Sequence, residues 1–121
     1  MNYFKESEYT CKCGCGLSKL HPTTLLLANT TRNFYGKPMI VNSGCRCVDH
    51  NKKVKGAKNS SHTPRPDGWC YAMDIRCTNS SDRYFLLEAM RKAGINRIGI
   101  HKSFIHFDND PYKTEKVLFL Y

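Results

Sequence analysis

The order in which helix-like and strand-like segments follow one another is what most restricts the fold of this sequence. The chain predicts an irregular cysteine-rich segment, a helix, a strand, a long basic loop, a strand, a helix and then three strands. The corresponding ranges are 1–20, 22–35, 39–43, 46–65, 70–75, 80–94, 97–101, 104–108 and 117–121. Such an order is typical of an α+β fold, here with two main helices and a mostly antiparallel sheet.

Both predicted helices carry sequence signals at their ends. Pro22 suits a first helical turn, and Gly36 supplies a stop for the first helix. Ser80 or Ser81 can cap the second helix, and Gly94 ends it. One face of this second helix is apolar at helical spacing, with Leu86, Ala89, Met90 and Ala93.

Length and charge narrow the classes of protein to which the chain can belong. The 121 residues suffice for one core, so residues 1–121 are predicted to form a single domain. No run reaches the ~20 apolar residues of a membrane helix, and the first residues lack the apolar stretch of a signal peptide. The net charge of +9 favours a polyanionic partner, namely nucleic acid, an anionic membrane surface or an acidic cell-wall polymer.

The cysteines are numerous, and their number is odd. Seven thiols cannot all pair within one chain, and a chain without a signal peptide is expected in a reducing compartment. Three alternate as Cys11, Cys13 and Cys15, and two more as Cys45 and Cys47. Because zinc ribbons usually use Cys-x-x-Cys pairs, the pattern favours small buried thiols that pack as apolar residues. A structural zinc ion on the thiolates is the alternative.

Three polar residues stand in contexts that suggest a site. His62 follows two serines in a polar loop, and Asp74 is the single acid in an apolar run. His106 lies in the alternating segment 104–108, so His106 and Asp108 share one face of a strand, and Ile105 and Phe107 share the other. Two imidazoles and one carboxylate are a suitable ligand set for catalytic zinc, with the fourth position left for water or substrate.

Several short motifs occur along the chain in a fixed order. They are Ser43-Gly44-Cys45-Arg46-Cys47, His50-Asn51, Gly56, Ser61-His62, Ala72-Met73-Asp74-Ile75 and Phe104-Ile105-His106-Phe107-Asp108. In this order the motifs resemble a family of bacterial and phage zinc peptidases, the D-alanyl-D-alanine carboxypeptidases and L-alanyl-D-glutamate endopeptidases, many of them phage endolysins. The resemblance covers nearly the whole chain and is closest to the short, single-domain branch of the family. The start of this chain, with Phe4, Glu8 and residues 11–16, also resembles the opening segment of that branch.

The resemblance implies the hedgehog/DD-peptidase fold, an α+β fold in which an antiparallel sheet holds a metal ion. His62, Asp74 and His106 then correspond to the zinc ligands of the family. Arg46 corresponds to the arginine that contacts the substrate near the scissile carbonyl, where a guanidinium can stabilise the developing oxyanion. Without the resemblance, Arg46 would be interpreted as a solvated surface charge.

The sequence departs from the family pattern between the first two ligands. His62 and Asp74 lie 12 positions apart, which is farther than is usual in the family and implies an insertion. The extra loop, residues 63–69, contains two prolines and the single tryptophan, and it is expected to line the substrate cleft or to form a lid. Asp67 in this loop is the alternative second ligand, although segment 72–75 matches the family better.

A second departure concerns the general base. Many family members have an acidic residue three positions before the last histidine, where this chain has Ser103. The remaining candidates are His101 on the preceding strand and Asp108 on the strand of His106. Alternatively, Asp108 orients the His106 ring, and His101 is an ordinary exposed histidine.

The sequence therefore predicts an enzyme, a monomeric zinc-dependent peptidase that cleaves peptidoglycan stem peptides as a carboxypeptidase or an endopeptidase. Zn²⁺ is the expected cofactor, and a cell-wall target agrees with the net charge. The protein is expected to be made in a host cytoplasm and to act on the wall as a phage lysis or virion-associated enzyme. The alternative is a non-catalytic module that binds the wall or a virion partner through basic residues 46–65, which the absence of an acid at Ser103 favours. Nucleic-acid and membrane partners are not expected, because the chain lacks RNA-recognition, helix-turn-helix and zinc-finger patterns and a membrane-spanning run.

Overall fold

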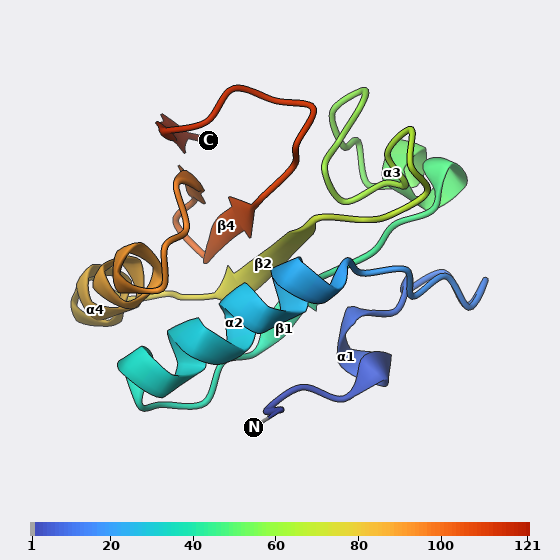
Figure 1. Cartoon of the computed structure of the whole chain (residues 1–121). Coiled ribbons are helices and arrows are strands. Elements are labelled where there is room, and N and C mark those ends of the chain that lie inside the picture. Colours follow the sequence, from blue (N-terminus) through green and yellow to red (C-terminus); the bar gives the residue numbers. More distant parts are fainter. Residues whose placement is uncertain (1) are drawn as a thin grey trace.

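The computed structural model describes residues 2–121, in which five strands form one sheet and four helices lie around it (Figure 1). The helices are α1 (Glu6–Tyr9), α2 (Pro22–Tyr35), α3 (Val48–Lys53) and α4 (Ser80–Lys92). The strands are β1 (Val41–Ser43), β2 (Ala72–Arg76), β3 (Arg97–Ile100), β4 (Phe104–Asp108) and β5 (Val117–Leu120). The α+β architecture predicted from the sequence is confirmed.

The sheet is mostly antiparallel and has the strand order β1-β2-β4-β3-β5. Among the described strands, β3 and β5 form the one parallel pair. At the centre of the sheet, Asp74 on β2 lies opposite His106 on β4, and Met73 lies opposite Phe107. Because side chains alternate between the two faces of a sheet, this register puts Asp74 and His106 on one face and the two apolar residues on the other.

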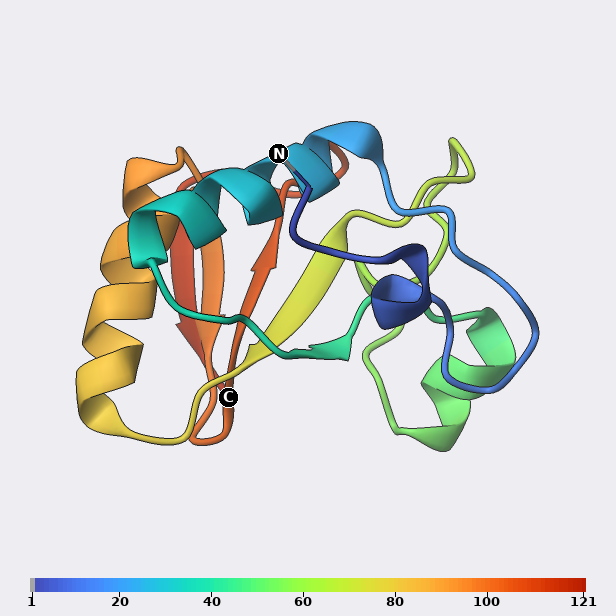
Figure 2. The same cartoon turned by 90° about the horizontal axis from the view of Figure 1, so that it is seen from below.

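Helices α2 and α4 pack against each other and cover the apolar face of the sheet (Figure 2). The buried cluster between helices and sheet includes Ala28, Met73, Ile75, Leu86, Met90, Ile98, Ile105 and Phe107. Helix α2 has the predicted bounds, and it ends at Gly36, whose φ of 73° lies in the left-handed region that favours glycine. Helix α4 is capped by Asn79 and not by Ser80 or Ser81 as predicted, because the Asn79 side chain accepts the capping hydrogen bond from the Asp82 amide.

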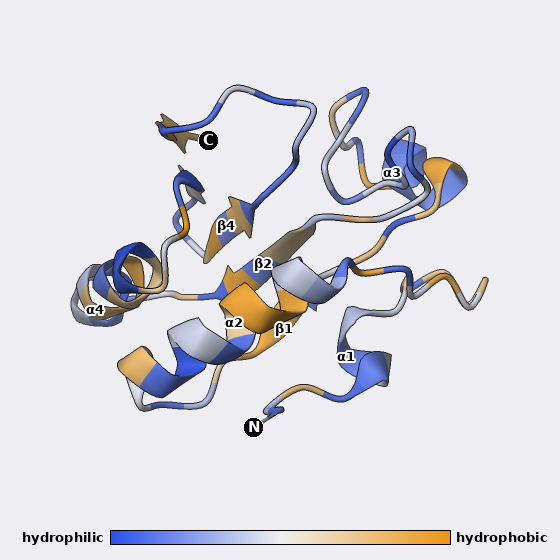
Figure 3. Ribbon diagram, viewed as in Figure 1, coloured by the Kyte–Doolittle hydropathy of each residue, from blue (hydrophilic) through white to orange (hydrophobic). Residues whose placement is uncertain are grey.

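The far end of the molecule consists of α1, α3 and the loops around them, and it is more hydrophilic than the sheet and α2 (Figures 1 and 3). Neither short helix was predicted. Helix α1 lies in the segment expected to be irregular, and α3 lies in the segment expected to be mostly loop. Six residues or fewer carry too little hydrophobic periodicity to be recognised. The cap of α3 is also unusual, since the Cys47 sulfur accepts from the His50 amide.

Every strand except β4 differs from its predicted range by one or two residues at an end. Strand β1 begins at Val41 instead of residue 39, β2 spans Ala72–Arg76 instead of 70–75, and β3 and β5 each end one residue earlier than predicted. Cys70, predicted to begin β2, forms an isolated parallel bridge with Leu20 instead. No helix among residues 2–121 combines the length and the apolar character needed to cross a membrane.

Candidate active site

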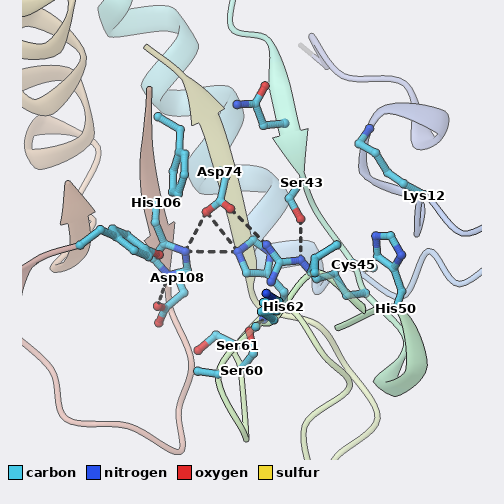
Figure 4. Close-up of a pocket in the computed structure, with 18 of the residues that line it drawn as sticks. Lys12, Ser43, Cys45, His50, Ser60, Ser61, His62, Asp74, His106 and Asp108 are labelled. Carbon is cyan, nitrogen blue, oxygen red and sulfur yellow. Dashed lines mark hydrogen bonds and ion pairs between the residues drawn. The ribbon is translucent and has the colours of Figure 1, made fainter. Parts of the chain in front are cut away.

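Two histidines and one aspartate meet on the polar face of the sheet (Figure 4). His62 Nε2 lies 3.1 Å from Asp74 Oδ1 and 3.2 Å from His106 Nδ1. His106 Nδ1 lies 2.9 Å from the same carboxylate oxygen. All three side chains are buried. The structure thus brings together the three residues that the sequence suggests as metal ligands. His62, Asp74 and His106 are called the metal-ligand group below.

Different elements position the three side chains. Asp74 and His106 face each other across the β2–β4 pair, so the sheet register sets their separation. His62 comes from the loop between α3 and β2, where its backbone is fixed on both sides. The Arg46 amide donates to the His62 carbonyl oxygen at 2.8 Å, and the His62 amide donates to Ser60 Oγ at 3.2 Å.

The outer nitrogen of each imidazole is engaged with an acceptor. His62 Nδ1 lies 2.7 Å from the Gly44 carbonyl oxygen, and His106 Nε2 lies 2.7 Å from Asp108 Oδ2. Because these oxygens only accept, the two outer nitrogens carry the protons and donate. When the rings are neutral, their inner nitrogens therefore present lone pairs to each other and to the Asp74 carboxylate. Three converging acceptors need a cation among them, and the set matches the ligands of zinc.

Neighbouring charges keep the carboxylates of the site ionised. Burial by itself raises the pKa of Asp74, but hydrogen bonds from His62 and His106 in their protonated form, and attraction to them, outweigh it and bring the pKa below its usual range. Burial likewise raises the pKa of Asp108, and His106 together with Arg97 lowers it overall. A carboxylate must be deprotonated to bind a metal ion, so the charge state of Asp74 fits the role of ligand.

Asp108 uses both of its carboxylate oxygens within the protein. Oδ2 accepts from His106, and Oδ1 accepts from Arg97 Nε at 2.7 Å and from the Asp110 amide at 3.1 Å. The side chain is 1% exposed. This geometry favours the second of the two predicted roles, in which Asp108 orients the His106 ring, over the role of general base.

His101 contacts Ser103 and does not itself line the cleft that contains the metal-ligand group. Its ring stacks on Phe104, with the ring centroids 4.4 Å apart. His101 Nδ1 accepts from the Ser103 amide at 3.1 Å and lies 2.9 Å from the Ser103 hydroxyl. Ser103 does line the cleft. A contribution of His101 to proton transfer would therefore pass through the Ser103 hydroxyl.

Arg46 lies beside the metal-ligand group with three fixed partners. Its Nη2 lies 3.4 Å from Asp74 Oδ2, Nε donates to Ser43 Oγ at 2.9 Å, and Nη1 donates to Asn51 Oδ1 at 3.2 Å. The backbone of Asn51 is in turn held by Gly56, whose amide donates to the backbone carbonyl oxygen of Asn51 at 2.8 Å. The Arg46 side chain is only 16% exposed, so it is not a solvated surface charge. The motif suggested no role for Asn51, which the structure shows to position the guanidinium.

Aromatic side chains of β5 cover the sheet next to His106, which the sequence did not indicate. Gly99 on β3 lies opposite His106, and Phe119 on β5 lies opposite Gly99. A Cβ atom on Gly99 would overlap the Phe119 ring, whose centroid lies 5.6 Å from that of His106. Tyr121 also lines the cleft. A glycine inside a strand was the available signal, since it often marks such a close approach.

Asp67 lies outside the metal-ligand group, so the alternative second ligand is not the one that the fold brings to the histidines. Its carboxylate accepts from the Tyr71 hydroxyl and from the Trp69 amide, the latter at 3.0 Å. None of residues 63–69 lines the cleft within the described chain, contrary to one expectation for this loop. Asp74 alone fills the position between the two imidazoles.

The cleft around the metal-ligand group has a volume of about 840 Å³. Its basic lining residues are Lys12, Arg46, His50, Lys55, Arg97 and Lys113. Among residues 2–121, the only carboxylates that line it are Asp74 and Asp108, both of which are engaged as described. A cleft with this charge attracts anionic molecules.

A comparison with protein-family models matches residues 2–108 to the family described as Peptidase M15. The chain belongs to the M15 peptidase family. The match includes all three candidate ligands and Arg46, and M15 peptidases are zinc-dependent. The predicted fold family and the class of metallopeptidase are thereby confirmed. A search of curated proteins found no match to this M15 chain.

Proposed function

We propose that this M15 peptidase hydrolyses peptide bonds in the stem peptides of peptidoglycan, using zinc held by His62, Asp74 and His106. The observation that carries the proposal is the convergence of two imidazole nitrogens and a buried carboxylate in a basic cleft. A bound zinc ion would polarise the substrate carbonyl and lower the pKa of a water molecule to about 7.

Arg46 supplies positive charge where the carbonyl oxygen of the substrate becomes negative. Its guanidinium is held by Ser43, Asn51 and Asp74, so it need not reorganise during the reaction. A preorganised donor of this kind stabilises a developing oxyanion more than a mobile one does. Asp108 serves the reaction indirectly, since it keeps the His106 proton on Nε2 and the lone pair on Nδ1.

Ser103 and His101 form the pair that we assign to proton transfer. Both carboxylates that line the cleft are engaged by protein groups, whereas Ser103 lines the cleft and its hydroxyl lies 2.9 Å from His101 Nδ1. If the two act as one relay, Ser103→Ala and His101→Ala should each lower kcat, and the double variant should lose little more than either single variant. Independent, additive losses would contradict the relay.

The charge of the cleft supports a substrate with carboxylates. Lys12, Lys55 and Lys113 line the cleft together with Arg46, and the chain carries a net charge of +9. Peptidoglycan stem peptides contain free carboxylates, and the wall itself is anionic. We therefore place the site of action at a bacterial cell wall, with lysis of a host wall by a phage enzyme as the proposed context.

A non-catalytic wall-binding module is the second candidate, and Ser103 is the observation that favours it. The position where many relatives carry an acid has only a hydroxyl group, and no carboxylate in the described cleft replaces it. Such a protein would retain the fold, the metal and the basic cleft, and it would bind stem peptides without cleaving them.

Mass spectrometry of purified peptidoglycan separates the two candidates. We expect new peptide termini after incubation with the zinc-loaded protein, and their sequence identifies the bond that is cut. Addition of a chelator and the substitution His62→Ala should abolish them, whereas Asp67→Asn, outside the cleft, should not. A zinc-loaded protein that binds peptidoglycan and never generates new termini would establish the binding module instead.

A further inference from the structure

A second group of metal-binding side chains lies outside the cleft group. Cys11, Cys13 and Cys15 follow α1, and Cys47 precedes α3. The four sulfur atoms all lie within 4.8 Å of one another. Cys13 is central, with its Sγ 3.5 Å from Cys11 Sγ and 3.6 Å from Cys47 Sγ.

These separations agree with four sulfurs around one metal ion. Zinc–sulfur bonds of about 2.3 Å in a tetrahedron put the sulfurs about 3.8 Å apart. A disulfide requires about 2.05 Å, and all four cysteines are free thiols in the structure. The two measured distances are therefore close to the value for a shared ion and far from the value for a covalent bond.

Local backbone geometry explains how alternating cysteines converge. In an extended strand, residues two apart are separated by roughly 6.6–6.8 Å, which is too far for one ion. Here Gly14 and Gly16 have φ values of 89° and 86°, and the Cys11 amide donates to the Leu17 carbonyl oxygen at 2.7 Å. The chain therefore closes into a tight loop, and its glycines are required for their φ values, because no neighbour lies within 4 Å of a Cβ at either position.

Backbone amides point at two of the sulfurs. The Cys47 amide donates to Cys11 Sγ at 3.4 Å, and the His50 amide donates to Cys47 Sγ at 3.3 Å. Donors of this kind stabilise negative charge on sulfur, and the thiolate is the form that binds metals. Cys45, Cys70 and Cys77 are buried in the apolar core, as the sequence predicted for small thiols. That prediction is wrong for Cys13 and Cys15, which are exposed.

We propose that Cys11, Cys13, Cys15 and Cys47 bind a second, structural zinc ion. Four protein ligands close the coordination sphere, as in structural zinc sites, whereas the histidine site has three. Cys47 directly follows Arg46, so the ion ties the loop after α1 to the segment that carries the oxyanion donor. Lys12, which lies between two of the ligands, lines the cleft.

Zinc stoichiometry tests the second site independently of activity. The full chain, purified under reducing conditions and reconstituted with Zn²⁺, should contain two zinc ions. Cys47→Ser and Cys15→Ser should each contain one, as should His62→Ala, while Cys77→Ser should keep two as the matched cysteine control. A fully reduced His62→Ala protein that holds no zinc ion, or a Cys47→Ser protein that retains as much zinc as the wild type, would overturn the proposal.

Cobalt reports the ligand type even if a cysteine variant fails to fold. Co²⁺ added to reduced His62→Ala should produce the intense near-ultraviolet charge-transfer absorption of cobalt bound to thiolates. Absence of this absorption, with the seven thiols shown to be free by alkylation and mass spectrometry, would refute the site. Disulfides among the four cysteines in protein purified with reductant would refute it as well. Neither result bears on whether the histidine site hydrolyses peptidoglycan.

Discussion

Asp108 contacts the candidate metal ligand His106 through one carboxylate oxygen and the buried Arg97 through the other. The substitution Asp108→Asn leaves one oxygen in place of two, so the amide can accept from His106 or from Arg97 but not from both. The NH₂ group of the new asparagine then faces whichever donor, His106 or Arg97, the oxygen does not bind. We predict two separate losses, one in stability and one in zinc affinity.

The magnitudes follow from the two contacts. Breaking a buried ion pair from one side costs about 3–5 kcal/mol, and we expect about 3 kcal/mol because Arg97 Nη1 keeps its bond to the Thr114 carbonyl oxygen. Removal of the carboxylate behind a metal-ligand histidine typically lowers metal affinity 10–100-fold. Chains of this length unfold with roughly 6–18 kcal/mol, so the variant should fold and both losses are measurable.

Urea unfolding of the metal-free protein measures the first loss, and competition with a chromophoric chelator measures the second. The double variant Arg97→Met/Asp108→Asn removes the guanidinium that the single variant leaves unpaired. It should recover most of the stability and none of the zinc affinity, because only the His106 contact concerns the metal.

Asp110→Asn is the matched control. Asp110 is also buried; its Oδ2 forms an ion pair with Arg65, whose Nε lies 2.9 Å away, and accepts from Ser61 Oγ at 2.7 Å. It contacts neither histidine ligand through its side chain, so its substitution should lower stability and leave zinc affinity unchanged. Wild-type zinc affinity in Asp108→Asn would refute the reasoning, since the carboxylate would then not orient His106.

Three further predictions concern the cleft. Arg46→Ala should lower kcat on a defined stem peptide by about 10²–10³-fold with zinc content retained. Arg46→Lys should recover only part of this rate, because lysine lacks the planar fork of the guanidinium. A normal rate in Arg46→Ala would remove Arg46 from the mechanism. Gly56→Ala would force a Cβ into Asn51, the partner of Arg46, so kcat should fall while zinc content stays the same, and unchanged kinetics would show that Asn51 does not position the guanidinium. Gly99→Ala should lower the free energy of unfolding by about 1 kcal/mol, because the Phe119 ring must move, and it should cost nothing in a Phe119→Ala background, which urea unfolding of the four proteins can check.

Elements with strong local signals were predictable from the sequence. Helix α2 has the predicted bounds because Pro22 and Gly36 restrict its two ends, and β4 has them because apolar and polar residues alternate from Ile105 to Asp108. Helix α3 was missed, since one and a half turns with a cysteine cap resemble a loop in sequence. The ligand set was suggested by residue type and by family resemblance, both of which are properties of sequence.

The sequence by itself determined which residues carry the chemistry, because imidazole, carboxylate, thiol and guanidinium groups have their properties wherever they lie. Only the tertiary structure decided which of these groups act together. The β2–β4 register selects Asp74 over Asp67, and the two contacts of Asp108 favour an orienting role over that of a base. The same holds for Cys47, which joins three cysteines far away in the chain. Such choices depend on distances of a few ångströms between segments remote in sequence, and local patterns contain no information about those distances.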